Sequence, residues 1–314
     1  MRGFEELVAE AAAVPLTGWD FGWQSGRAAG SEPSWSYPGM ARDLLRDCYG
    51  RLRDRGDLLG VDTGGPLGVD TGGLVGVDTG GPLGVDTGGP LGVDTGGLVG
   101  VDTGGLLGVD TGGLLDVDTG GGELLASLAP LPAGTTAVEG WRPNLEVARA
   151  RLSPLGAEVV FAPDATLPIA DESVSVVLNR HGRLDAAETA RVLRPAGWLL
   201  TQQVGSEDCA AVNELLGAPD AYRTPWNADV AAEALKAAGF TVTDVREEWP
   251  WFAFRDIGAL VYQLRAVPWQ VPDFTVTRYH EGLRRIDAII RRRGEFRVLA
   301  HRFLIRARKP PSRP

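Results

Sequence analysis

Residues 114–123 constrain the fold more than any other stretch, because they join three kinds of local structure. Leu114 to Val117 form a short, mainly apolar run that predicts a buried strand. Thr119 to Gly122 follow as a glycine-rich turn, and Glu123 begins a segment of helical character. A glycine turn between a strand and a helix lets a ligand approach the backbone, and it directs helix N-terminal N–H groups at that ligand. The segment therefore predicts a ligand site of a kind that many nucleotide-binding folds share.

A second acid follows at a distance that suits an adenosine ligand. Thr136 to Glu139 predict another strand, which ends in a carboxylate 17 residues after Gly122. A carboxylate at this place can accept hydrogen bonds from both ribose hydroxyls of an adenosine. Glu139 is therefore a candidate ribose ligand.

With these residues the chain resembles the class I S-adenosylmethionine-dependent methyltransferases, of the small bacterial methyltransferase-domain type. Their fingerprint is a strand, an acid, an apolar residue and three spaced glycines. Asp116 matches the acid, and Gly120 and Gly122 match the second and third glycines. Asp118 stands at the first glycine position, although Asp tolerates a positive φ less well than Gly. The resemblance implies an α/β fold: a doubly wound, mostly parallel, seven-stranded Rossmann-like sheet with helices on both faces.

The rest of the chain alternates helix and strand patterns, which is typical of a parallel sheet covered by helices. The motif from Glu188 to Gly197 also resembles the helix and turn before the family's fifth strand. Further strands are predicted at 158–161, 173–178, 198–204, 240–245 and 298–307, and helices at 4–13, 40–49, 123–129, 143–152, 186–193, 228–238 and 256–266.

The resemblance also implies a set of residues that bind S-adenosylmethionine. In this family an Asp-Ala pair after the third strand lies by the adenine, and Asp164-Ala165 match that pair. The residues implied to bind the cofactor are Asp116, Asp118, Thr119, Gly120, Gly122, Glu139, Gly140, Asp164, Ala165 and Asn179. No metal is expected, because the sulfonium methyl of the cofactor is itself the electrophile.

His181 is the candidate catalytic base. It follows the fourth strand, and histidine titrates near neutral pH. A base is needed only if the methyl acceptor is a hydroxyl or a protonated amine. A purely structural role for His181 stays open.

An internal repeat precedes the glycine turn. Val-Asp-Thr-Gly-Gly occurs eight times at a strict period of eight, beginning at Val61, Val69, Val77, Val85, Val93, Val101, Val109 and Val117. Only the last copy has an acid, Asp116, before its valine and a third glycine, Gly122, after its pair. The first seven copies therefore resemble duplicates of half a binding motif.

The repeat has four possible interpretations. A calcium β-roll would need a nine-residue period and more acids, and an aspartic protease would need two equivalent lobes. A stacked β-solenoid is a third interpretation, which the abundance of glycine disfavours. A flexible insertion is preferred. The expected organisation is an N-terminal helical and aromatic cap (1–59), the repeat insertion (60–113), the methyltransferase domain (114–308) and a disordered tail (309–314).

The amino-acid composition limits the classes of binding partner and the cellular compartment that we expect. The 314 residues carry a net charge of −10, which gives no strong nucleic-acid signal and favours a small-molecule acceptor. Two cysteines indicate a reducing compartment. No signal-type apolar core and no membrane-spanning run is evident, so a cytoplasmic protein is expected. Neither the methyl acceptor nor the oligomeric state follows from the sequence.

Two other functions stay open at this point. An NAD(P)-dependent Rossmann oxidoreductase would share the glycine turn and the following acid. The pair Asp164-Ala165 counts against it. A non-catalytic scaffold built around the repeats would bind no cofactor at all.

Overall fold

The computed structural model describes residues 2–16, 21–50 and 112–312. The chain divides into two compact units, one formed by residues 1–41 with 113–314 and the other by residues 42–112. Most of the repeat, and hence the predicted insertion, lies outside the described residues. Of the second unit, the structure describes residues 42–50 and 112, where the Tyr49 hydroxyl donates a 3.3 Å hydrogen bond to the Gly112 carbonyl.

The seven-stranded sheet of the first unit has the order β4-β3-β2-β5-β6-β10-β7. Strand β10 is antiparallel to both of its neighbours, and the other pairings within this sheet are parallel. The predicted mostly parallel, doubly wound sheet is therefore confirmed. Its strands are β2 (Gly113–Val117), β3 (Thr136–Glu139), β4 (Glu158–Phe161), β5 (Val174–Arg180), β6 (Leu193–Val204), β7 (Thr241–Glu248) and β10 (Arg302–Arg308).

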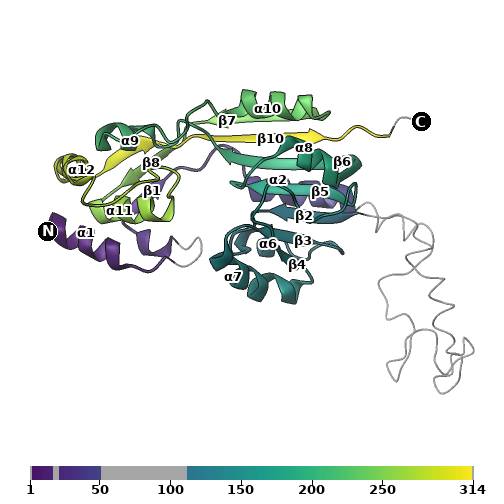
Figure 1. The fold of residues 1–314 in the computed structure, drawn as a ribbon, viewed down its shortest axis with the longest axis horizontal. Coiled ribbons are helices and arrows are strands. Elements are labelled where there is room, and N and C mark those ends of the chain that lie inside the picture. Colours follow the sequence, from purple (N-terminus) through teal and green to yellow (C-terminus); the bar gives the residue numbers. More distant parts are fainter. Residues whose placement is uncertain (1, 17–20, 51–111, 313–314) are drawn as a thin grey trace, which may run out of the picture. The chain divides into compact units, whose positions relative to one another are not determined.

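The order of the strands reverses between β2 and β5. From β2 the chain goes to β3 and β4 on one side, and it then returns to place β5 on the other side of β2. In a sheet of this kind ligands bind outside the carboxyl ends of the strands at such a switch point. The glycine turn after β2 and the residues after β5 therefore meet at the expected place (Figure 1).

Helices surround this sheet because its central strands, β2 and β5, are buried on both faces. Helix α7 lies beside β3 and β4, α8 beside β6, and α10 beside β7 and β10, while α6 packs on α7 (Figure 1). One core joins Leu115, Val177 and Phe303 of the sheet to Val192 of α8 and Leu235 of α10. The helices are α6 (Glu123–Ser127), α7 (Arg142–Leu152), α8 (Ala186–Val192) and α10 (Ala228–Ala237). A 3₁₀ turn, Ser153–Leu155, continues α7.

A second sheet, with the order β1-β8-β9, was not expected. Its strands β1 (Ala28–Gly30), β8 (Trp251–Phe254) and β9 (Phe296–Leu299) are all antiparallel to their neighbours. A separate core joins this sheet to surrounding helices. These are α1 (Phe4–Ala13), α9 (Ala210–Leu216), α11 (Ile257–Ala266) and α12 (His280–Arg293). Helix α2 (Tyr37–Leu45), with a π turn at Arg46–Gly50, and a 3₁₀ turn at Gly22–Gln24 complete the described elements.

Two sequence predictions need correction here. The last strand, predicted at 298–307, is two strands in different sheets, because the chain leaves β9 at Leu299 and enters β10 at Arg302. The Ala300 N–H donates to the Pro250 carbonyl, which continues the β8–β9 pairing by one residue before the chain leaves this sheet. The predicted disordered tail (309–314) includes two residues that make defined contacts. Lys309 donates to the Leu193 and Ala190 carbonyls, and the Ala196 N–H donates to the Pro310 carbonyl.

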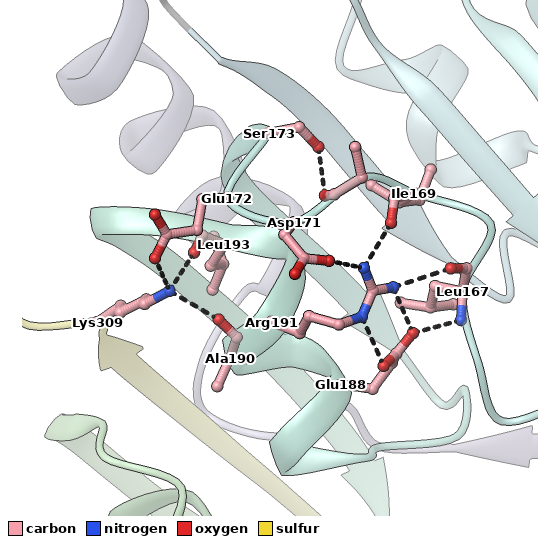
Figure 2. A network of polar contacts seen from close by, with 11 residues as sticks. Leu167, Ile169, Asp171, Glu172, Ser173, Glu188, Ala190, Arg191, Leu193 and Lys309 are labelled. Carbon is pink, nitrogen blue, oxygen red and sulfur yellow. Dashed lines mark hydrogen bonds and ion pairs between the residues drawn. The ribbon is translucent and has the colours of Figure 1, made fainter.

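Arg191 of α8 fixes the loop between β4 and β5. Figure 2 shows its guanidinium donating to the carbonyls of Leu167 and Ile169 and to the carboxylates of Glu188 and Asp171. Glu188 in turn accepts from the Leu167 N–H at 2.6 Å. Arg191 is not a candidate catalytic residue, since all of these contacts hold chain segments together. It sets the position of the loop that follows the predicted adenine-side residues.

Within the described parts of the chain, none of the helices combines the length and apolar character that crossing a bilayer requires.

Candidate functional site

The turn after β2 has the conformation that its glycines predict. Gly120 and Gly122 have φ of 64° and 79°, in the left-handed region that suits glycine. Asp118, in the first glycine position, has φ of 54°, so the turn keeps its left-handed residue without a glycine. The Thr119 N–H donates to the Val138 carbonyl, and the Gly122 N–H donates to the Thr119 carbonyl. The turn is thereby tied to β3 and to the start of α6.

Glu139, the predicted ribose ligand, lies beside this turn. One carboxylate oxygen accepts from the Gly120 N–H at 2.7 Å, and the other accepts from the Trp141 N–H at 2.7 Å. The residue is only 4% exposed. Burial raises the pKa of Glu139, while the two main-chain N–H groups act in the opposite direction. Each oxygen retains a second lone pair, so the carboxylate can accept further hydrogen bonds.

Asp116 is the most buried acid of the site. Its carboxylate accepts from the Thr119 hydroxyl at 2.6 Å, and the residue is 3% exposed. Burial raises the pKa of Asp116 to about 7, and the nearby charges of Asp118 and Glu139 act in the same direction. The three carboxylates therefore make a site where a positive charge is favoured.

Asp118 also joins the β2 turn to the loop after β5. Its carboxylate accepts from the Arg183 N–H at 2.8 Å and forms an ion pair with the Arg183 guanidinium at 3.3 Å. The same guanidinium donates to the Ala162 carbonyl after β4. Arg183 was not recognised in the sequence, because its role depends on loops far apart in the chain. The acid that replaces the expected first glycine thus gains a partner that a glycine would lack.

The predicted contact Asn179 is fully engaged within the protein. Its side-chain oxygen accepts from Gln203 and from the Gly182 N–H, and its side-chain nitrogen donates to the Arg183 carbonyl at 2.6 Å. Its main-chain N–H donates to the Tyr37 hydroxyl at 3.0 Å. The present hydrogen bonds of Asn179 shape the loop after β5, and its direct contact with a cofactor stays a prediction.

Gly140, Asp164 and Ala165 lie around the carboxyl ends of β3 and β4. A Cβ at Gly140 would make tight contacts, since it would lie 3.1 Å from the Ala162 carbonyl oxygen and 3.3 Å from the Arg183 guanidinium. Asp164 and Ala165 are exposed in a bend after β4. Their predicted place by the adenine is compatible with this exposure and stays a prediction.

His181 lies at the end of β5 with φ of 65°. Its main-chain N–H donates to the Gln202 carbonyl at 2.7 Å, and its Nε2 lies 2.9 Å from the Gln202 side-chain nitrogen. Crowding by protein atoms around the ring, with the charges of Arg302 and Arg180, lowers the pKa of His181 to about 3. The imidazole is therefore neutral at physiological pH and holds a proton only weakly.

Two surface hollows lie beside α12, and neither is lined by a predicted site residue. Among the described residues no group of three or more His, Cys, Asp or Glu side chains is arranged to hold a metal ion. The candidate site is therefore the polar edge at the switch point.

A glycine turn at the switch point of a doubly wound sheet, with a carboxylate at the end of the next strand, defines an α/β domain suited to an adenosine-type cofactor. Residues 115–201 match the family described as "Methyltransferase domain". The chain carries a methyltransferase domain, and the predicted enzyme class, an S-adenosylmethionine-dependent methyltransferase, is confirmed.

Three solved structures illustrate which known proteins have a similar fold. A candidate methyltransferase from Bacillus halodurans C-125 is 22% identical, covers 67% of this chain and 99% of its own, and has a TM-score of 0.46. The YcgJ protein from Bacillus subtilis is 17% identical, with 64% and 93% covered and a TM-score of 0.46. The [4+2]-cyclase SpnF is 19% identical, with 64% and 77% covered and a TM-score of 0.42. These similarities are loose, so the fold assignment stands on the strand order. No curated protein sequence matched the chain.

Proposed function

We propose that the protein transfers a methyl group from S-adenosylmethionine to a small-molecule acceptor, with the cofactor bound at the turn after β2. The observation that carries this proposal is the 2.7 Å hydrogen bond from the Gly120 N–H to Glu139. It joins the glycine turn to the carboxylate at the end of β3, and a ribose lying against that turn would meet the remaining lone pairs of Glu139.

The charges of the site support this cofactor over a neutral or anionic one. S-adenosylmethionine carries a positive sulfonium that supplies the electrophilic methyl group. Asp116, Asp118 and Glu139 surround the turn, and burial raises the pKa of each. A cationic ligand stabilises the ionised form of such carboxylates, whereas ionised carboxylates would repel the two phosphates of a dinucleotide. The oxidoreductase alternative is therefore disfavoured.

The residues of the chain would then serve mainly to bind and align. Asp118 and Arg183 hold the loops after β2 and β5 together, and Glu139 orients the turn. Fixing the acceptor in line with the sulfur–methyl bond is the main task left to the protein, since the bond to be broken is already activated. The small size of the acceptor follows from the weak nucleic-acid signal of the chain, with its net charge of −10.

Calorimetric titration of the full chain tests the cofactor assignment. S-adenosylmethionine should bind, and Glu139→Ala should weaken binding by about 1.5–3 kcal/mol, the scale of lost hydrogen bonds to a charged group. Asp164→Ala should have a smaller effect of the same sign. Glu146→Ala is the matched control, because Glu146 is exposed on α7 and pairs only with Arg149 in the same helix. Unchanged affinity in Glu139→Ala would contradict the ribose assignment, and binding of NAD(P)H instead would contradict the proposed function.

A further inference from the structure

Trp35 determines how the side chain of Gln202 is oriented. The indole Nε1 of Trp35 lies 2.7 Å from the Gln202 side-chain oxygen, and both residues are buried at 5% exposure. An indole N–H can only donate, so the partner atom must be the amide oxygen and not the amide nitrogen. The amide nitrogen of Gln202 therefore faces the other way, toward His181.

Gln202 in turn determines which ring nitrogen of His181 carries the proton. The amide nitrogen lies 2.9 Å from His181 Nε2, and an amide nitrogen is a donor only. His181 Nε2 must accept this hydrogen bond through its lone pair. A neutral His181 then carries its proton on Nδ1, and a doubly protonated ring would set one N–H against another.

The rest of the surroundings leave Nδ1 available. Among the described residues no hydrogen-bond partner of Nδ1 is found, and the residue as a whole is exposed. Arg180, the preceding residue, is exposed, and its side chain has no hydrogen-bonded or ion-paired partner in the described chain. Arg302 is the other charged group that acts on the ring, and it is paired with Asp208. The ring thus presents an N–H donor close to an unpaired positive charge.

We infer that His181 binds the methyl acceptor as a hydrogen-bond donor through Nδ1, and that the acceptor carries an anionic oxygen such as a carboxylate or a phenolate. Trp35 and Gln202 are positioning residues that hold the tautomer required for this contact. The inference rests on the proposed function for the identity of the reaction. It replaces the hypothesis of His181 as a base, because the Nε2 lone pair is occupied and Nδ1 already carries a proton.

Long-range ¹H–¹⁵N NMR of the three histidines of the full chain tests the tautomer without any cofactor. The His181 signals, assigned by their loss in His181→Asn, should report the Nδ1–H tautomer and should not titrate between about pH 5 and pH 8.5. Gln202→Glu presents oxygens to both Trp35 and His181, so it should switch the ring to Nε2–H and raise its pKa. A wild-type ring in the Nε2–H form, or one that titrates near pH 6.5, would overturn the inference.

Two further variants separate this relay from general disturbance. Trp35→Phe removes the indole donor, frees the amide of Gln202 to rotate, and should produce a mixture of His181 tautomers. Trp249→Phe is the matched control, because Trp249 stacks on His301 at 4.8 Å and should change the signals of His301 alone. If Trp35→Phe folds with the wild-type His181 tautomer unchanged, the positioning role of Trp35 is wrong.

The acceptor class is tested with acetate as the probe. Adding sodium acetate should shift the His181 Nδ1–H signal, whereas sodium chloride at equal ionic strength should not. The acetate shift should be smaller in Arg180→Gln if Arg180 contributes to anion binding. The absence of an acetate-specific shift would refute the anionic oxygen. None of these measurements involves S-adenosylmethionine. The inference about His181 can therefore be refuted while cofactor binding is confirmed, and cofactor binding can be refuted while the inference about His181 holds.

Discussion

Gly122→Ala tests whether the glycine turn is limited by backbone conformation or by the room around it. Gly122 caps the start of α6 with φ of 79° and ψ of 10°. A Cβ there would lie 2.8 Å from both Cγ and Cδ1 of Leu152, which is fully buried on α7. Gly156 provides a matched control. It has φ of 79° and ψ of 14°, and a Cβ there would meet nothing within 4 Å.

The expected magnitudes follow from separating these two contributions. A left-handed conformation costs an L-residue about 1–2 kcal/mol, and this cost applies equally to Gly122→Ala and Gly156→Ala. Overpacking against a fixed core costs about 1–3 kcal/mol, and it applies only at Gly122. Gly122→Ala should therefore lower the free energy of unfolding by roughly 2–5 kcal/mol, against roughly 1–2 kcal/mol for Gly156→Ala. Urea denaturation followed by circular dichroism measures both, with the slope of the transition expected to be unchanged.

A double-mutant cycle with Leu152→Ala makes the steric argument refutable. Leu152→Ala alone should cost about 2–5 kcal/mol through the cavity it leaves. Combined with Gly122→Ala, the loss should fall short of the sum by about 1–3 kcal/mol, because the new methyl group then has space. Equal losses for the two glycine variants, or additive losses in the cycle, would show that Leu152 does not limit the turn.

Three other perturbations test the acids and the repeat. Burial raises the folded-state pKa of Asp116 to about 7, whereas its unfolded value is near 4. The stability that protonated Asp116 contributes is therefore fully present below about pH 4 and is lost as the pH rises through 7, by up to about 4 kcal/mol. Asp116→Asn should remove this pH dependence of the free energy of unfolding, measured by urea titrations at several pH values. Asp118→Gly relieves about 1 kcal/mol of left-handed backbone strain, but it removes charged hydrogen bonds to Arg183 worth roughly 1.5–3 kcal/mol. We therefore expect a net loss of stability of about 1 kcal/mol. A gain in stability would show that the ion pair contributes little. Deleting residues 60–115 joins Leu59 to Asp116 and puts Leu58 and Leu59 in the places of Leu114 and Leu115 in β2. This variant should bind S-adenosylmethionine at least as tightly and melt at an equal or higher temperature, and loss of binding would show that the deleted residues take part in folding or function.

The features that the sequence predicts correctly are local ones. Strand β3 is predicted at its observed bounds, since Thr136 to Glu139 form a short run with two β-branched residues between Gly134 and Gly140. The glycine turn is predicted because few residues other than glycine adopt φ near 64° or 79°. Glu139 could be selected by its distance from the turn alone, and it does contact Gly120.

The features that the sequence does not reveal depend on pairs far apart in the chain. Strand β1 has three residues, too few for a pattern, and it forms only because Ala28–Gly30 can pair with β8. Arg183 looks like any exposed loop arginine until Asp118 and Ala162 are brought beside it. Gln202 did offer a signal: a buried polar side chain inside an apolar strand must find partners, and it finds Trp35 and His181.

The contacts of the N-terminal segment also explain why a long repeat can be accommodated. The Tyr37 hydroxyl donates to the Leu200 carbonyl of β6 and accepts from the Asn179 N–H of β5, so the segment before the repeat is fixed to the large sheet. The segment after the repeat enters β2 at Gly113, which is paired with β5. Both ends of the connection are thus held by contacts that do not involve the repeat. The cost of a longer connection is then mainly that of closing a loop, about 0.6 kcal/mol for each doubling of its length. Against a typical stability of about 5–15 kcal/mol, we expect that the number of copies can change without loss of the fold or of the turn that begins at Asp118.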